Sequence, residues 1–242
     1  MDIPILFEDN DLLVINKPAG VVVNRAQSVK DETIQDWAEK KLGLASAQPQ
    51  SWGDTFESRA GIVHRIDKET SGVLIIAKNP QAFIALQGQF KDRTTRKTYL
   101  ALVHGAVAPP EGEIRAPVGR LPWNRERFGI LPGGKEAVTK YHVHRSWLTV
   151  HGKTKEQISL VELHPETGRT HQIRVHLKYM NHPIIADFLY AGRKTARSDR
   201  TWAPRVMLHA WKIIITHPVT GSPLAIEAPI PDDISRIISN NQ

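Results

Sequence analysis

The chain has 242 residues, 40% hydrophobic and 24% charged, which is the ordinary mix of a globular protein large enough to bury a core. It contains no cysteine, which excludes disulfides, thiolate metal ligands and a cysteine nucleophile, and no apolar run is long enough to predict a transmembrane helix. The N-terminus does not resemble a secretory signal. A net charge of +7 favours polyanionic partners such as RNA, although many basic proteins bind no nucleic acid.

The first part of the chain alternates short apolar runs with turns. Lys17-Pro18-Ala19-Gly20 interrupts the second apolar run, and Thr33 is a suitable N-cap for an amphipathic helix. The elements predicted here are, in order, strands 5–9 and 12–16, extended chain at 21–23, a helix over 34–42 and a polar loop over 43–58.

The middle of the chain continues this alternation of strands, helices and turns. The elements predicted here are extended chain over 62–67, a turn over 68–72, a buried strand at 73–77, a helix over 80–91, a strand at 97–103 and a turn at 109–112. The segment from Arg120 to Glu136 is rich in proline, glycine and arginine, which predicts a basic loop or hairpin.

The last part predicts strands near 138–143 and 158–163, a helix, and strands at 210–216 and 224–228. Thr170 is the expected N-cap of that helix, which runs to about Met180 with apolar residues on one face. Many strands interspersed with a few helices indicate an α+β domain.

The first segment that suggests chemistry is His64-Arg65-Ile66-Asp67-Lys68-Glu69-Thr70-Ser71-Gly72. If the chain is extended here, Arg65 and Asp67 share a face while Ile66 points to the core. A nearby guanidinium favours the ionised carboxylate that a nucleophile requires. On spacing alone, a solvated surface turn with a salt bridge is the favoured interpretation of the segment.

The second such segment covers residues 167–177 and carries two arginines. Arg169 precedes the predicted helix start, where backbone amides favour anions. Arg174 lies at the boundary of the apolar face, so it needs a partner, for which Asp67 is one candidate. A solvent-facing or phosphate-contacting Arg174 is the alternative.

Tyr99 and the histidines are less specific signals. Tyr99 lies in an alternating strand, so it either packs in the core or lines a pocket, where a phenol can stack on a base or move a proton. The histidines near these segments lack metal-ligand spacing, and no phosphate-binding or dinucleotide-binding glycine pattern occurs, so we expect no metal site. The histidines in question are His64, His164, His171 and His176.

Taken in order, these segments resemble the RluA family of pseudouridine synthases. Residues 64–72 resemble its catalytic loop, with isoleucine where leucine is usual, and residues 97–99 resemble its tyrosine motif. Further matching segments are residues 15–20, 134–139, 168–177 and 183–190. The match runs from about Ile5 to Pro229 in the family's order, and the ordered set is far more specific than any one motif.

The resemblance implies a pseudouridine synthase fold, with a long, mixed, mostly antiparallel sheet, flanking helices and a central RNA-binding cleft. It implies that residues 1–242 form a single catalytic domain without the accessory N-terminal RNA-binding domain of many relatives. The implied protein is a cytoplasmic enzyme, by default a monomer, that binds ribosomal or transfer RNA, has no membrane association and needs no cofactor or metal.

The resemblance also implies roles for individual residues. Asp67 would be the catalytic aspartate, Tyr99 the active-site tyrosine and Arg174 the arginine that pairs with the aspartate. Arg65 matches the arginine that enters the RNA helix where the target base was. The residues expected to contact RNA are Arg65, His64, Arg169, Arg125, Arg127 and Lys135, with Arg120 and a second basic run at Arg193, Lys194, Arg197, Arg200 and Arg205 as further phosphate contacts.

The implied reaction isomerises a uridine to pseudouridine. The base must first leave the stack, which costs a few kcal/mol. Asp67 then either attacks the ribose to give a glycosyl ester, or a proton is lost from carbon 2 to give a glycal, with Tyr99 as a possible base. Two alternatives are a non-catalytic RNA-binding or RNA-folding protein on the same fold, and a metal-dependent hydrolase that uses the histidines.

Overall fold

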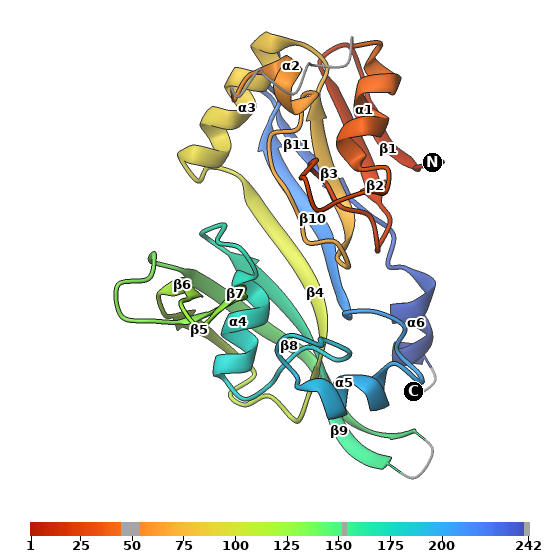
Figure 1. Ribbon diagram of the computed structural model, residues 1–242, viewed down its shortest axis with the longest axis vertical. Coiled ribbons are helices and arrows are strands. Elements are labelled where there is room, and N and C mark those ends of the chain that lie inside the picture. The colour runs from red at the N-terminus through yellow and green to blue at the C-terminus, as the bar shows by residue number, and fades with distance from the viewer. Residues whose placement is uncertain (45–53, 152–153, 240–242) are drawn as a thin grey trace. The chain divides into compact units, whose positions relative to one another are not determined.

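The computed structural model describes residues 1–44, 54–151 and 154–239 (Figure 1). The chain divides into two compact units. The first unit comprises residues 1–96 and 210–229, and the second comprises residues 97–209 and the segment that begins at Ile230. Among the described residues, no helix combines the length and the apolar character that crossing a membrane requires.

The first unit is built on strands in the order β1-β2-β3-β10, with β11 paired to β10, and the β1–β2, β2–β3 and β10–β11 pairs are antiparallel. Its elements are β1 (Ile5–Glu8), β2 (Leu12–Lys17), α1 (Ile34–Leu42), α2 (Phe56–Arg59), β3 (Ser71–Ala77), α3 (Pro80–Lys91), β11 (Pro223–Glu227) and most of β10 (Leu208–Thr216). Every residue of β3 is buried, as its continuous apolar run predicts. The apolar side of α3 packs into the same core through Ala82, Phe83 and Leu86.

Local sequence signals set the ends of the helices in this unit. Thr33 caps α1 with a full capping box, in which Thr33 and Asp36 bond each other's backbone, and Gly43 ends the helix at a left-handed φ of 64°. Asn79 caps α3, and Pro80 occupies its first position. The predicted bounds of both helices are confirmed.

Two predictions for this unit need correction. Residues 43–58 were expected to be a loop, but Thr55 caps the short helix α2 through a second capping box; residues 45–53 of that prediction lie outside the described part of the chain. Residues 62–67 form no strand, apart from an isolated bridge between Ile62 and Ile76. They are irregular chain, and Ile66 still points inward with 6% exposure.

The second unit contains antiparallel strands in the order β4-β9-β8-β5 and a separate two-stranded sheet. Its elements are β4 (Arg96–His104), β5 (Glu111–Arg115), β6 (Val118–Leu121), β7 (Asn124–Ile130), β8 (Val138–His151), β9 (Thr154–Pro165), α4 (Gln172–Tyr179), α5 (Arg193–Asp199) and α6 (Asp232–Ser239). The predicted strand near 138–143 is the first part of β8, and the predicted strand near 158–163 lies within β9. Both extend further because their outer parts pair with each other, from Arg145 opposite Leu160 to His151 opposite Thr154.

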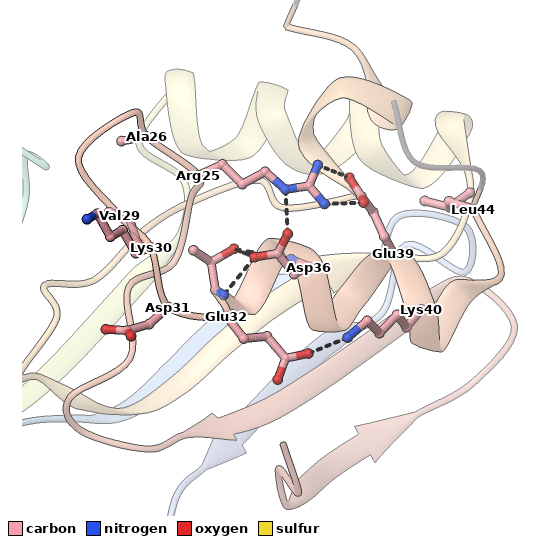
Figure 2. A pocket seen from close by; sticks show the side chains of 11 residues that line it. Arg25, Ala26, Val29, Lys30, Asp31, Glu32, Asp36, Glu39, Lys40 and Leu44 are labelled. Carbon is pink, nitrogen blue, oxygen red and sulfur yellow. Dashed lines mark hydrogen bonds and ion pairs between the residues drawn. The ribbon is translucent and has the colours of Figure 1, made fainter. Parts of the chain in front are cut away.

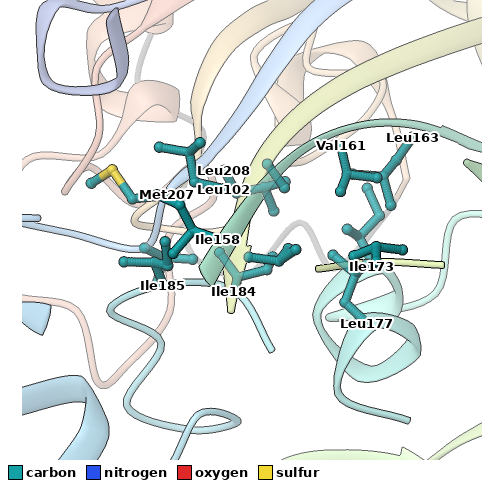
Figure 3. Packing of buried hydrophobic residues seen from close by; sticks show 14 of the residues in the cluster. Leu102, Ile158, Val161, Leu163, Ile173, Leu177, Ile184, Ile185, Met207 and Leu208 are labelled. Atoms are coloured by element: carbon teal, nitrogen blue, oxygen red, sulfur yellow. The ribbon is translucent and has the colours of Figure 1, made fainter. Parts of the chain in front are cut away.

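The core of the second unit lies between β4, β9, α4 and the segment 184–186. Leu102, Val161, Leu163, Ile173 and Ile184 pack together there, each at most 7% exposed (Figure 3). Helices α5 and α6 also belong to this unit and were not predicted. Both units consist of mostly antiparallel strands with flanking helices, so the α+β class is confirmed. The central cleft involves both units and stays a prediction.

Candidate active site

The carboxylate loop in the first unit begins at His64 and ends where β3 begins. Asp67 is half-buried, between buried Ile66 and exposed Lys68, and the amide of Thr70 donates to the carbonyl oxygen of Asp67 at 3.1 Å. Thr70 itself is 2% exposed. The turn therefore orders the backbone on both sides of the carboxylate, as a group that must be aimed at a substrate requires.

Lys17 fixes this loop from the end of β2. Its side chain is fully buried, and Nζ donates to the carbonyls of Pro18, Val21 and Lys68 at 2.7, 2.8 and 3.1 Å. The amide of Gly20 donates to the same Lys68 carbonyl at 2.8 Å. A buried ammonium is tolerated because carbonyl oxygens replace its water, and here they tie two loops together next to Asp67.

The last residue of the motif, Gly72, lies where a larger residue would not fit. Its φ is +114°, and a Cβ at this position would lie 2.1 Å from the carbonyl oxygen of Ala210. Only glycine lets the first residues of β3 approach β10 so closely. The motif's final residue therefore positions the loop through close backbone packing.

The two residues before Ile66 lie in different surroundings. His64 is half-buried, accepts from the amide of Ile75 at 2.9 Å through Nε2, and stacks on Phe90 with ring centroids 4.6 Å apart. Arg65 is exposed. His64 thus supports β3, and RNA contacts by His64 and Arg65 stay predictions.

In the second unit, Tyr99 lies on β4 opposite Leu163 of β9. It is half-buried, and part of its side chain packs against the core cluster of this unit, as one of the two interpretations of Tyr99 predicted. Its catalytic role is not tested by these contacts.

Arg174 of α4 is buried, so its charge needs a partner, and Asp187 is a partner in the structure. Arg174 is 7% exposed, and it donates from Nε to Asp187 Oδ2 at 2.7 Å and from Nη2 to Oδ1 at 2.9 Å. Asp187 is fully buried and also accepts the amides of Leu189 and Tyr190 at 3.0 and 3.2 Å. Asp67 belongs to the other unit, so its pairing with Arg174 stays a prediction.

The start of α4 differs from the prediction. The N-cap is His171, at a left-handed φ of 56° and without a side-chain cap bond, rather than Thr170. Gln172 orders this turn instead, because its Oε1 accepts from Thr167 Oγ1 and the Arg169 amide at 2.7 and 3.0 Å. Its Nε2 donates to the carbonyl of Val138 at 3.0 Å. The turn is therefore anchored to β8 by a buried amide, a long-range contact that capping rules do not describe.

A basic hairpin, residues 118–130, comprises β6 and β7 and confirms the hairpin alternative. Arg120 and Arg125 are exposed and Arg127 is half-buried. Trp123 in the turn is 76% exposed, and it belongs to no motif that predicted a role for it. Two neighbouring cations extend this surface: exposed Lys135, whose backbone bridges Val118, and Arg169, whose Nε donates to the Glu136 carbonyl at 3.0 Å.

The second predicted basic run is only partly exposed. Arg205 is 7% exposed and forms a fork with Asp233 at 2.6 and 2.9 Å, so its proposed phosphate contact was wrong. Arg200 donates to the carbonyls of Ala186 and Pro204. Arg193, Lys194 and Arg197 are exposed on or beside α5.

Neither group of possible metal-binding side chains within the described ranges contains a predicted site residue or one of the four histidines noted in the sequence. The groups are Asp9, Asp11 and His217, and His104, Glu156 and Asp199. In the second group, His104 Nδ1 lies 2.9 Å from Glu156 and Nε2 lies 3.1 Å from Asp199. Both ring nitrogens therefore serve as donors, which is the arrangement of a protonated imidazole.

We expect the His104 ion pairs to make stability depend on pH. Burial alone would lower the pKa of His104, but the hydrogen bonds that it donates to Asp199 and Glu156 outweigh burial and raise the pKa from 6.5 to about 9. Because the folded-state pKa is the higher one, the stabilisation is complete below about pH 6.5 and is lost as the pH rises through about 9. It amounts to at most about 3 kcal/mol.

Urea unfolding of the wild type and His104→Gln at pH 6, 7.5 and 9.5 measures this contribution. The difference in unfolding free energy between the two proteins should shrink with rising pH. His142→Gln, on an exposed histidine of the same unit, is the control. A difference that stays constant over this range would contradict a charged His104.

A pocket of about 530 Å³ lies in the first unit, between the loop before α1 and the helix itself (Figure 2). Its charged groups are largely paired with one another. Arg25 forms ion pairs with Asp36 and Glu39, and Lys40 lies 2.7 Å from Glu32. The pocket contains none of the predicted site residues, and its ion pairs serve to hold the loop on α1.

The fold and these residues define an α+β enzyme with an ordered carboxylate loop, a buried arginine and an exposed basic hairpin with an aromatic tip, which is a combination suited to chemistry on a nucleic acid. Comparison with known proteins identifies the family. Residues 11–179 match the family described as RNA pseudouridylate synthase.

Relatives of known family match nearly the whole length of this chain. "Uncharacterized RNA pseudouridine synthase YlyB" of Bacillus subtilis is 39% identical, and the match covers 99% of this chain and 73% of that protein. "Ribosomal large subunit pseudouridine synthase D" of Neisseria meningitidis serogroup B is also 39% identical, with 99% of this chain and 61% of that protein covered. The chain therefore belongs to the RNA pseudouridylate synthase family and is an RNA isomerase.

Solved structures agree on the fold. "Human RNA Pseudouridylate Synthase Domain Containing 4" has a TM-score of 0.69 at 25% identity, with 98% of this chain and 92% of that one covered. "Human RNA Pseudouridylate Synthase Domain Containing 1" has a TM-score of 0.72 at 24% identity, with 99% and 94% covered. The pseudouridine synthase fold expected from the sequence is thus confirmed.

Proposed function

We propose that this RNA pseudouridine synthase modifies one or more uridines of large-subunit ribosomal RNA, with Asp67 as its catalytic carboxylate. The name of the Neisseria relative supports this target. The observation that carries the role of Asp67 is the construction of its loop, which is tied by buried Lys17, closed by Thr70 and packed through Gly72. Such ordering serves a group that must be aimed at a reacting bond.

The chemistry assigned to the other two residues follows from their side chains. Tyr99 is half-buried on β4, so its phenol is suited to contact the flipped base or to accept the ribose proton in the glycal route. The guanidinium of Arg174 is buried and held in place, and a fixed positive charge of this kind keeps a nearby carboxylate ionised. The isomerisation expels no group and consumes no second substrate, so it proceeds with these side chains and the RNA alone.

We further propose that the two units act as one catalytic domain, that the enzyme is a monomer and that it works in the cytoplasm. The order of the motifs supports the first point, since the carboxylate loop lies in one unit and Tyr99 and Arg174 lie in the other. The lack of cysteine is compatible with a reducing compartment. Size-exclusion chromatography with light scattering tests the monomer, because a dimer mass would contradict it.

Pseudouridine mapping on total RNA, from cells with and without the gene, tests the function and identifies its target. We expect a site in large-subunit ribosomal RNA to disappear with the gene and to return with the wild type but not with Asp67→Asn. Loss of a transfer RNA site instead would correct the target. Restoration of every site by Asp67→Asn would favour the non-catalytic RNA-binding alternative, which no feature of the structure or the relatives supports.

The basic hairpin, with Lys135 and Arg169, is our proposed RNA-contacting surface in the second unit. Changing Arg125 and Lys135 together to glutamine removes two exposed cations, so the slope of log affinity against log salt should decrease in magnitude by about 1.4 to 1.8. Filter binding from low to moderate salt measures this slope. The control, Lys155→Gln with Arg236→Gln, removes the same charge from exposed positions on β9 and α6; equal slopes for both double variants would contradict the assignment.

Trp123 is suited to a different kind of contact with the same RNA. An exposed indole among cations offers a face on which an unpaired base can stack, which is worth about 1 to 3 kcal/mol. We expect Trp123→Ala to weaken RNA affinity about 5- to 150-fold while leaving the salt slope unchanged, because no charge is lost. Unchanged affinity would show that the indole does not touch the RNA.

A further inference from the structure

Tyr190 occupies a position between the basic hairpin and the helix that carries Arg174, all within the second unit. It lies three residues after Asp187 and is 7% exposed. Its amide donates to Asp187 Oδ1 at 3.2 Å, the same oxygen that accepts from Arg174 Nη2. The backbone of Tyr190 is therefore fixed by the carboxylate that holds the arginine.

The ring of Tyr190 lies against the guanidinium. Arg174 Cζ is 5.0 Å from the ring centroid, within the range of a cation–π contact. The Asp187 fork holds one edge of the guanidinium, and the face of the Tyr190 ring packs against the same group. The fork and the ring together restrict the directions in which the remaining N–H groups of Arg174 point.

The hydroxyl of Tyr190 connects this pair to the hairpin. It accepts from the amide of Phe128 at 3.1 Å, and it lies 2.8 Å from His171 Nδ1. A hydroxyl has one donor and two acceptor sites, so both bonds can form at once. His171 is the N-cap of α4, so one oxygen atom links β7 to the first turn of the helix that carries Arg174.

The contacts continue outward along the hairpin. The Phe128 ring meets the His171 ring edge-on at 5.6 Å, and Arg120 lies over Phe128 with Cζ 5.2 Å from the centroid. Val118 and Val175 pack in the same small cluster as Tyr190. A continuous series of contacts thus runs from an exposed cation of the hairpin to buried Arg174.

We propose that Tyr190 is a positioning residue, which sets the orientation of Arg174 and couples it to the hairpin through its hydroxyl. RNA held on the hairpin then stabilises the arrangement in which Arg174 acts. This inference rests on the proposed roles of Arg174 and the hairpin. It predicts that the hydroxyl matters for the rate of the reaction more than for the affinity for RNA.

The variant that isolates the hydroxyl is Tyr190→Phe, which keeps the ring over Arg174 and the apolar packing. Single-turnover rates with enzyme in excess, and RNA affinities, are measured for the wild type, Tyr190→Phe, Arg174→Lys and the double variant. We expect Tyr190→Phe to slow conversion about tenfold with affinity within twofold of wild type. In the Arg174→Lys background the same change should slow conversion less than twofold, because residues that act together are not additive.

The matched control is Tyr141→Phe, a tyrosine of similar burial on β8 of the same unit. It should leave rate and affinity at wild-type values, and melting temperatures confirm that all variants fold. An unchanged rate in Tyr190→Phe would overturn the proposal. An equal slowing in both backgrounds would also overturn it, since the hydroxyl would then act independently of Arg174.

A second readout does not depend on activity. In protein labelled with ¹⁵N-arginine, the Nε–H signal of Arg174 is assigned by its loss in Arg174→Lys. We expect hydrogen exchange of this proton to be at least tenfold faster in Tyr190→Phe than in the wild type or Tyr141→Phe. Equal exchange rates would refute positioning. A wild type that converts no uridine, with faster exchange in Tyr190→Phe, would refute the proposed function while supporting the positioning of Arg174.

Discussion

Asp67→Asn is expected to lower the single-turnover rate of pseudouridine formation by at least about 10³-fold. The amide is nearly the same size as the carboxylate but carries no negative charge, so it can neither attack the ribose nor stabilise positive charge there. The loop should keep its shape, because backbone hydrogen bonds, buried Lys17 and the close packing of Gly72 hold it.

Measurements of folding and binding separate catalysis from structure in this variant. RNA affinity should stay within a few-fold of wild type, and the melting temperature should change little. Asp92→Asn, on an exposed carboxylate at the end of α3, makes the same chemical change elsewhere in the unit and should leave the rate unchanged. Comparable rates for Asp67→Asn and the wild type would disprove the assignment of Asp67.

Asp187→Ala is expected to cost about 3 to 5 kcal/mol of unfolding free energy, the largest stability effect that we predict. The substitution removes the buried carboxylate fork from Arg174 and the acceptor of the Leu189 and Tyr190 amides. Desolvating a guanidinium without that counter-ion is costly because the protein interior solvates charge poorly. The melting temperature should fall by about 6 to 20 °C.

An exposed ion pair of the same unit provides the comparison. Glu166 pairs with Lys140 at 2.7 Å, with the two side chains 44% and 56% exposed. Because water screens this pair, Glu166→Ala should cost less than about 1 kcal/mol. A loss of similar size for both variants, measured by urea unfolding, would mean that Asp187 is not the principal counter-ion of Arg174.

Elements with local signals could be predicted from the residues alone. Helix α1 has its N-cap at Thr33 and ends at Gly43, and α3 begins after the cap Asn79 with Pro80. The bounds of both helices could therefore be predicted from neighbouring residues. The apolar run of β3 predicted a buried strand, and its burial is complete. The ordered motifs indicated the family, and the match over residues 11–179 confirms it.

The partners of the charged groups, in contrast, depend on contacts between distant parts of the chain. Arg174 with Asp187 and Arg205 with Asp233 are ion pairs between residues 13 and 28 positions apart, and no local pattern specifies them. Lys17 is a comparable case, because it reaches the carbonyl of Lys68, 51 positions away. Long-range pairs depend on which surfaces the fold brings together, whereas composition shows only that a cation is present.

The start of α4 shows both a local signal and a tertiary contact at work. Thr170 is a good N-cap by its chemistry, yet the helix begins one residue later because Gln172 bonds to Thr167 and Val138 and holds the turn on β8. A cap contributes about 1 kcal/mol, so a buried network with several hydrogen bonds outweighs it. Local propensity thus determined that a helix forms here, and tertiary contacts determined where it begins and what its arginine meets.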